Sequence, residues 1–196
     1  GKIFWRDKVR YLIKNNLVQQ FIINSKIFNV KDARNFYHIS KHPRYNSISV
    51  EKEIDNFLKK RNITLNQNRN LCFDEKKYLI NHPLINYGNH TSNHYLLSSL
   101  NKQEQYKEIL DCKIFLKNAD INKSKVFCLP FGGSNTFNND TQEILHQLDY
   151  KNILKNTNKL NEFQNSDFVE RFMPKTYDIK TTLKKLYLKN KLIKKI

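Results

Sequence analysis

Two histidines four residues apart, His90 and His94, are the side chains best suited to chemistry in this sequence. On a helical turn this spacing brings side chains to about 5–6 Å, close enough for two imidazoles to bind one divalent metal ion. Only four glycines occur in the chain, and Gly88, Gly132 and Gly133 fall in two short loops, the first of which leads into His90. Because glycine permits positive φ and close approach of the backbone to a ligand, we predict that both loops border the site.

The histidine pair also has a simpler interpretation, a coincidence on the surface of a helix. The surroundings favour the metal site, because a Gly-Asn dipeptide precedes His90 and a Pro-Phe-Gly segment follows downstream. The other histidines have no comparable partners and are expected to be solvated or structural: His38, His42, His82 and His146.

Helices and strands are predicted to alternate along the chain. Apolar periodicity predicts helices over residues 5–16, 50–61, 102–117, 140–148 and from 178 to the end, and strands over 84–87, 125–129, 151–155 and 167–172. Residues 17–28 fit either a helix or a strand. The strand at 125–129 is almost continuously apolar, which is typical of a parallel sheet buried on both faces. An α/β fold follows, with its ligand site at the carboxyl ends of the strands, where both glycine loops lie.

Two amphipathic segments have alternative interpretations. Trp5 is expected to pack in the core of the first helix, and the alternative is a platform on which a sugar stacks. The basic C-terminal helix is expected to pack by its Leu and Ile face with its lysines solvated, and the alternative is contact with anionic lipid.

The charge of the chain raises the possibility of an anionic partner. The 196 residues suit one domain, and 35 basic against 18 acidic residues give a net charge of +17. Only seven of the basic residues are Arg, and the lysines are spread along the chain, whereas nucleic-acid sites usually rely on Arg forks and basic stripes. We therefore expect no nucleic-acid partner and keep a basic nucleic-acid-binding protein as an alternative function.

Cysteine usage and the ends of the chain bear on its location. Three cysteines without a Cys-x-x-Cys pair indicate neither a disulfide framework nor a thiolate zinc cluster. Since no apolar run reaches transmembrane length and no signal peptide is recognisable, we expect a cytoplasmic protein, with the periplasm or cell envelope as the alternative. The sequence lacks an initiator Met and begins within an apolar helical pattern, which we interpret as a fragment whose beginning has been removed.

The segments His90–His94, after Gly-Asn, and Leu129–Gly132 resemble two motifs of the polysaccharide deacetylases of the NodB-homology type, carbohydrate esterase family 4. The likeness covers roughly residues 71–175. It implies an α/β fold with a deformed (β/α) barrel, and a hydrolase that removes N- or O-acetyl groups from a glycan with a metal held by one Asp and two His. By this resemblance residues 71–196 form the deacetylase-like domain, incomplete at its N-terminus, and residues 1–70 form a mainly helical insertion in the same structural unit.

The resemblance also assigns roles to individual residues. His90 and His94 would be the two histidine ligands of a divalent metal, with zinc as the default and cobalt or nickel compatible with the same donors. Phe131 and its neighbours would wall the groove and offer a backbone N–H to the oxyanion. The remaining residues implied to border the substrate are Thr91, Pro130 and Gly132.

The sequence departs from the family in its carboxylates. No Asp-Asp strand motif, the source of the third ligand and of the base, precedes His90, and no late Leu-His motif supplies the general acid. Cys128 stands where the family often has Arg, and we expect Arg171 to take over that role from another strand. We interpret the missing Asp pair as truncation. The predicted function is metal-dependent deacetylation of an acetylated glycan, a hydrolysis of amide or ester bonds, and the alternative is a catalytically inactive carbohydrate-binding relative.

Overall fold

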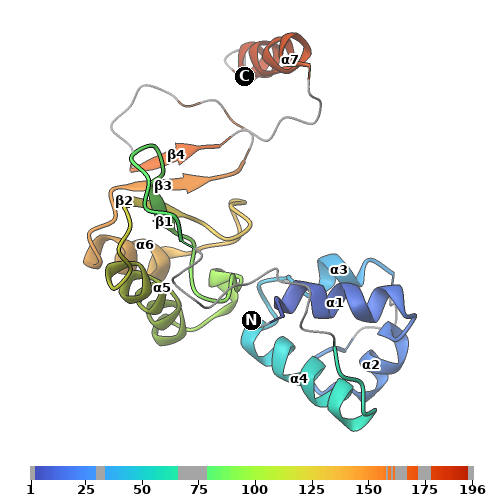
Figure 1. Cartoon of the computed structure of the whole chain (residues 1–196). Helices are drawn as coiled ribbons and strands as arrows, with labels where there is room; N and C mark the ends of the chain where they lie inside the picture. Colours follow the sequence, from blue (N-terminus) through green and yellow to red (C-terminus); the bar gives the residue numbers. More distant parts are fainter. Residues whose placement is uncertain are drawn as a thin grey trace.

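The chain forms a helical half followed by a half built on a parallel sheet (Figure 1). The structure is a computed structural model that describes residues 3–29, 34–65, 79–157, 159, 161, 167–171 and 178–193. The helices of the first half are α1 (Trp5–Lys14), α2 (Val18–Asn24), α3 (Phe36–Ile39) and α4 (Ser47–Lys60). The helices predicted over 5–16 and 50–61 are confirmed as α1 and α4, and the ambiguous segment 17–28 contains the helix α2.

Strands and helices alternate in the second half. The described strands are β1 (Tyr87–Asn89), β2 (Lys123–Cys128), β3 (Asn152–Lys155) and β4 (Phe168–Glu170), which pair in parallel in the order β1-β2-β3-β4. Helix α5 (Lys102–Lys117) connects β1 to β2, and α6 (Asn139–Gln147) connects β2 to β3. Right-handed crossovers place consecutive helices on one face of a sheet, and α5 and α6 pack against each other. The predicted α/β class is confirmed, and within the described part of the chain the sheet stays open instead of closing into a barrel.

One predicted strand begins later than expected. Pro83 and Leu84 form a turn in which Ile85 N donates to the His82 carbonyl at 2.9 Å. The strand predicted over 84–87 therefore starts at Tyr87, because a proline turn occupies the positions before it.

Side-chain caps fix where α5 and α6 begin. Asn101 accepts a hydrogen bond from Glu104 N at 2.9 Å, and the Glu104 carboxylate accepts one from Asn101 N at 2.9 Å. Asn138 and Thr141 make the equivalent capping box at the start of α6. Each box satisfies two backbone donors of the first turn. The short 3₁₀ helix η2 (Leu97–Ser99) lies between β1 and α5 and directly precedes α5.

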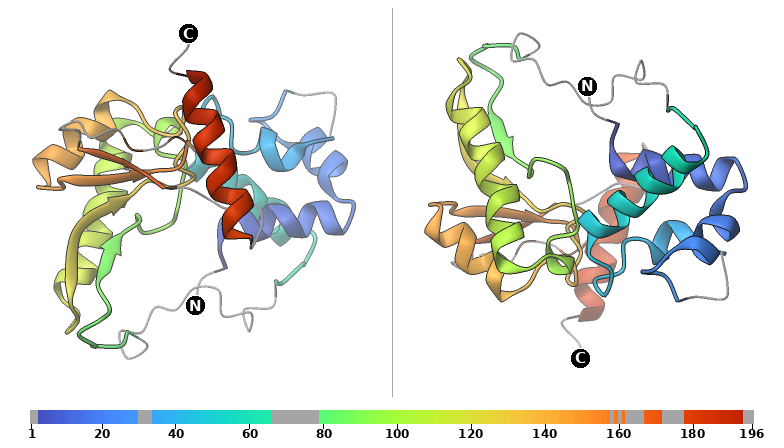
Figure 2. Two further views of the ribbon diagram at one scale, coloured as in Figure 1. Left: turned by 90° about the horizontal axis from the view of Figure 1, so that it is seen from above. Right: turned by 90° about the horizontal axis from the view of Figure 1, so that it is seen from below.

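A single apolar core joins the two halves, which lie side by side in both views of Figure 2. Trp5 is only 1% exposed, and its indole Nε1 donates to the His94 carbonyl at 3.1 Å. The prediction that Trp5 packs in the core is confirmed. Fully buried members of the core come from helices and strands alike: Val9, Leu12, Val50, Ile54, Leu97, Ile109, Phe127, Leu129 and Ile153. The helical half is therefore part of the scaffold that holds the histidine loop.

The C-terminal helix α7 (Ile179–Ile193) lies beyond β4, away from the other helices (Figure 1). Ile179, Leu183 and Tyr187 are 74%, 59% and 62% exposed. The prediction that this helix packs by its apolar face is therefore wrong for these side chains. Among the helices of the described residues, none combines the length and the apolar character needed to cross a bilayer.

Candidate active site

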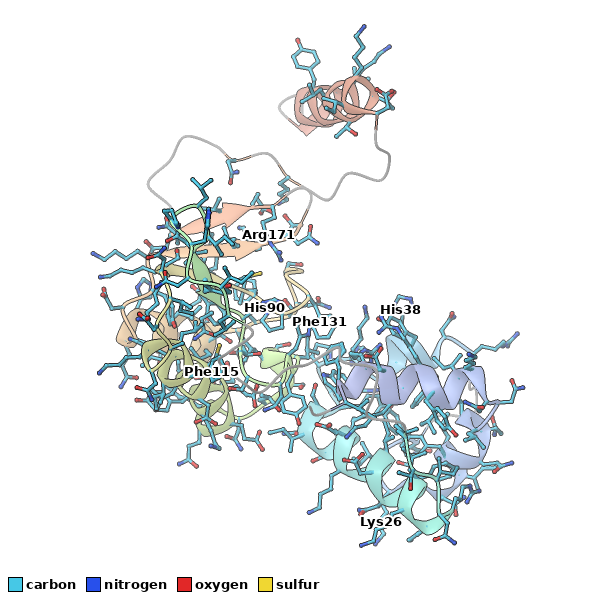
Figure 3. All side chains as sticks on the ribbon, viewed as in Figure 1. Lys26, His38, His90, Phe115, Phe131 and Arg171 are labelled. Carbon is cyan, nitrogen blue, oxygen red and sulfur yellow. The ribbon has the colours of Figure 1, made fainter. Side chains whose placement is uncertain are left out.

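The carboxyl ends of the parallel strands bring the predicted site residues together. His90 follows β1, the segment leading to Phe131 follows β2, Asn156 follows β3 and Arg171 follows β4. In Figure 3 the labelled His90, Phe131 and Arg171 lie on the side of the sheet that faces the helical half. Ligands of parallel α/β sheets bind at this edge. The loop that contains Gly132 and Gly133 follows β2 as predicted, whereas Gly88 lies within β1 and not in a loop, so that part of the prediction is wrong.

The two histidine rings meet, although the chain between them is not helical. The ring centroids of His90 and His94 are 4.6 Å apart and the rings are nearly perpendicular, at 82°. Thr91 and His94 have φ of 65° and 55°, a left-handed conformation that stops an α-helix. The prediction of a helical turn is therefore wrong. A loop with two left-handed residues brings the rings together instead.

Buried side chains define the shape of this loop. Asn89 is fully buried, and its Oδ1 accepts from Thr91 N at 2.9 Å. Its Nδ2 donates to the Ile109 carbonyl at 2.9 Å and to the Tyr150 hydroxyl at 2.7 Å. Thr91 Oγ1 then accepts from His94 N at 3.0 Å. Asn89 was not among the residues predicted from sequence, and the available signal was the preference of Asn for turns that bond its side chain to backbone two residues on.

A carboxylate from α5 holds the middle of the loop. Glu108 is 5% exposed and accepts from Asn93 N at 2.9 Å and from Asn93 Nδ2 at 2.6 Å. The Glu108 carbonyl also accepts from Ser92 N at 3.1 Å. Glu108 was not predicted from the sequence, because its contact with Asn93 spans 15 residues and leaves no spacing signal. The position of α5 therefore controls the position of the histidine pair.

Burial keeps both imidazoles neutral. His90 Nδ1 lies 2.6 Å from the Cys128 carbonyl oxygen, which can only accept, so this nitrogen carries the proton and Nε2 keeps its lone pair. His94 Nδ1 is buried and has no hydrogen-bond partner among the described residues. Burial, with a smaller contribution from the neighbouring His90, lowers the pKa of His94 to about 4. Burial, followed by the charge of Arg171, lowers the pKa of His90.

The segment after β2 is held in a strained shape that requires glycine. Phe131 and Gly132 have φ of 64° and 71°. A Cβ on Gly132 would lie 2.8 Å from Asn156 N, which donates to the Gly132 carbonyl at 2.7 Å. The close approach of the β2 and β3 loops therefore excludes any larger residue at this position.

The same segment has a backbone donor beside the Phe131 side chain. Pro130 has no N–H, and Gly132 N donates to the Pro130 carbonyl at 2.7 Å. The Phe131 N–H has no partner among the hydrogen bonds of the described residues. The Phe131 ring lies 4.8 Å from the His94 ring, edge to face at 81°, so the side chain of this residue contacts the histidine pair.

Arg171 enters the site from β4. Its Nη2 would lie 3.4 Å from a Cβ on Gly132, and its charge contributes to the lowered pKa of His90 and His94. Arg171 Nε and Asn156 Oδ1 are buried without hydrogen-bond partners in the described structure, as is His94 Nδ1. Buried polar atoms normally have partners, so these three atoms could hydrogen-bond to a ligand.

The donors present fit part of a metal site. His90 has the arrangement common in metal-binding histidines, one ring nitrogen bonded to a carbonyl and the other available to the metal. In the described ranges no group of three or more His, Cys, Asp or Glu converges in a way that could hold a metal ion. Cys112 and Cys128 are free thiols whose pKa burial raises, while Cys72 lies outside the described residues. The two imidazoles are therefore nitrogen donors that a metal could use, and the described residues add no carboxylate that completes a group of three ligands.

Comparison with known proteins identifies one family. The family model described as polysaccharide deacetylase matches residues 52–153, more than half of the chain. The matched range contains β1, the histidine loop, β2 and the Pro-Phe-Gly segment. No curated protein and no solved structure gives a significant match.

Proposed function

Because the chain belongs to the polysaccharide deacetylase family, we propose that it contributes to an enzyme that uses a divalent metal to hydrolyse acetyl groups on a glycan. The observation that carries the proposal is the pair of imidazole rings, with centroids 4.6 Å apart, at the carboxyl edge of the parallel sheet. The Phe131 ring contacts that of His94, and the Phe131 N–H has no partner among the described residues. The charge of Arg171, whose Nε is buried, reaches both histidines. Together these groups provide nitrogen ligands, a hydrogen-bond donor and a positive charge.

His90 and His94 are the residues that would hold the metal, with zinc as the first choice for nitrogen ligands. A bound metal would polarise the acetyl carbonyl and make a water molecule more acidic. The protein fixes the His90 ring by its bond to the Cys128 carbonyl, which leaves Nε2 available. The lowered pKa of both histidines keeps them free of competing protons at neutral pH.

The segment after β2 would stabilise the oxyanion that forms when water adds to an acetyl carbonyl. The Phe131 N–H is a donor that this segment has available, and one such donor commonly contributes about 100- to 1000-fold to turnover. Arg171 would act as a positioning residue that holds a carboxylate base or the substrate beside the histidine pair. Its role would be supported if Arg171→Ala lowered kcat while Arg171→Lys restored part of it.

The base is the group that the described residues lack. In this proposal the chain as given binds metal and glycan, and turnover requires an added carboxylate pair. The test compares acetate release from N-acetylchito-oligosaccharides by the chain and by a version extended upstream through its natural coding sequence. We expect release from the extended version, and none from the extended version that carries both His90→Ala and His94→Ala.

A carbohydrate-binding relative without catalysis is the second candidate. It is favoured because the described residues contain no group of three or more His, Cys, Asp or Glu that could hold a metal ion. It would be established if the folded, zinc-loaded, extended version bound the oligosaccharides but released no acetate.

A further inference from the structure

A cavity lies between the helical half and the Pro-Phe-Gly segment. Its volume is about 340 Å³, within the range of sites that bind small ligands. His38, Lys41 and His42 line it from the helical half, and Phe131, Asn135 and Thr136 line it from the loop after β2. Figure 3 shows His38 and Phe131 on the two sides of this junction.

The cavity adjoins the candidate active site through one shared wall. Phe131 lines the cavity, and its ring also contacts the His94 ring, at 4.8 Å between centroids. The His94 ring is in turn 4.6 Å from that of His90. A polymer with one unit at the histidine pair would therefore place a neighbouring unit against Phe131, whose ring suits the apolar face of a sugar.

The lining of the cavity is basic. Lys41 Nζ lies 5.4 Å from the centroid of the Phe131 ring and 5.4 Å from that of Tyr37, and two histidines accompany it. None of the residues that line the cavity is acidic. Lys41 could pair with a negative charge on a sugar, and the Phe131 ring could pack against the sugar's apolar face. The polar Asn135 and Thr136 also line the cavity.

We infer that this cavity, formed with residues of the helical half, binds an anionic group on the glycan one unit away from the acetyl group at the histidine pair. The inference rests on the proposed function for the identity of the ligand as a glycan. It makes Lys41 a specificity-determining residue, and it names acidic acetylated glycans as the preferred substrate class. A carboxylate and a phosphate share the required chemistry.

Calorimetric titration of the intact chain at low salt tests the inference. The ligands are neutral N-acetylchitotetraose and a tetrasaccharide of alternating glucuronate and N-acetylglucosamine, each with and without inorganic phosphate as competitor. Tighter binding of the glucuronate ligand, by about fivefold, assigns a carboxylate. Equal binding of both ligands, with displacement by phosphate, assigns a phosphate group. Equal binding without displacement overturns the inference.

Variants locate the effect in the cavity. Lys41→Ala should abolish the preference for the acidic ligand over the neutral one, whereas Lys41→Arg should keep the preference. Lys52→Ala is the control, because Lys52 is an exposed residue of α4 that is outside the cavity lining. A preference that survives in a folded Lys41→Ala variant would contradict the inference.

The result can be separated from that of the deacetylase proposal. Selective binding without acetate release by the extended version would remove the deacetylase proposal and keep the cavity. Acetate release without any preference between the two ligands would keep the deacetylase proposal and remove the inference about the cavity.

Discussion

The burial of two adjacent histidines determines their protonation and therefore the chemistry open to them. Each would normally titrate near pH 6.5, but removal from water disfavours the charged form of both. A neutral imidazole is the form that binds a metal. The site is thus prepared for a cation at neutral pH even though Arg171 lies close by.

This burial predicts a pH dependence of stability. The pKa of His94 is about 4 in the folded chain and 6.5 in the unfolded chain, so between these values the unfolded chain binds the proton more readily. The contribution of His94 to the free energy of unfolding is fully present above pH 6.5. It decreases as the pH falls toward 4, by up to about 3 kcal/mol. Urea unfolding at pH 7 and pH 4.5, with a chelator present, measures it. His94→Gln should flatten this dependence, and an unchanged dependence in the variant would contradict the assignment.

Zinc binding should depend on both rings. His90→Ala or His94→Ala should raise the Kd for Zn²⁺ at least about tenfold, because each removes one of two nitrogen ligands. His146→Ala is the matched control, since His146 is exposed on α6. Calorimetric titration of the folded chain provides the measurement. Saturable binding that is identical in all three variants would exclude this pair as the metal site.

Adjacent glycines provide a sharp contrast in stability. Gly132→Ala should destabilise the fold by about 1–3 kcal/mol, because the residue has positive φ and its Cβ would meet Asn156 N at 2.8 Å. Gly133→Ala should change stability by less than about 0.5 kcal/mol, since its Cβ would make ordinary contacts at 3.5 Å. Denaturant unfolding gives the free energy of unfolding of each variant for this comparison. Equal effects would mean that the β2 and β3 loops do not approach as described.

At the level of elements, α5 acts as the support of the histidine loop. Glu108→Gln should weaken zinc binding about tenfold, because Gln cannot accept both Asn93 hydrogen bonds as a carboxylate does. Asp111→Asn is the control, one turn along α5, where the carboxylate pairs with Lys107 at the surface. The Kd for Zn²⁺ should be unchanged in the control. Equal losses in both variants would indicate a general effect of helix charge.

Elements were easier to predict from the sequence than the loops between them. The predicted helix at 102–117 matches α5, and the strands at 125–129 and 151–155 match β2 and β3 closely. His90 and His94 were correctly predicted to lie close together, but on a helical turn instead of a loop. Residues with left-handed φ leave no periodic pattern in a sequence, so the loop could not be predicted. Glu108 and the cavity beside Lys41 arise from contacts between distant segments, which spacing along the chain does not encode.

At the scale of the whole molecule, the shared core predicts cooperative unfolding. Leu12→Ala, in the helical half, should destabilise the chain by about 2–5 kcal/mol, because this side chain is fully buried. Ile23→Ala is the control in the same half, where the side chain is 72% exposed and the change should stay within about 0.5 kcal/mol.

Hydrogen exchange shows whether the two halves unfold together. Amides of β2 and β3 should lose protection in Leu12→Ala as much as those of α1, because the helices and the sheet bury their apolar side chains against one another. Unchanged protection of the strands would show that the helical half opens independently.

The hydrogen bond from Trp5 to the histidine loop has a practical consequence. Trp5 is the single tryptophan of the chain, and its indole is bonded to the His94 carbonyl. Its emission therefore comes from one place, next to the residues where metal and sugar are expected to bind. Any ligand that shifts this loop should change the intensity or wavelength of that light, so the natural chain carries its own fluorescent reporter without an added dye.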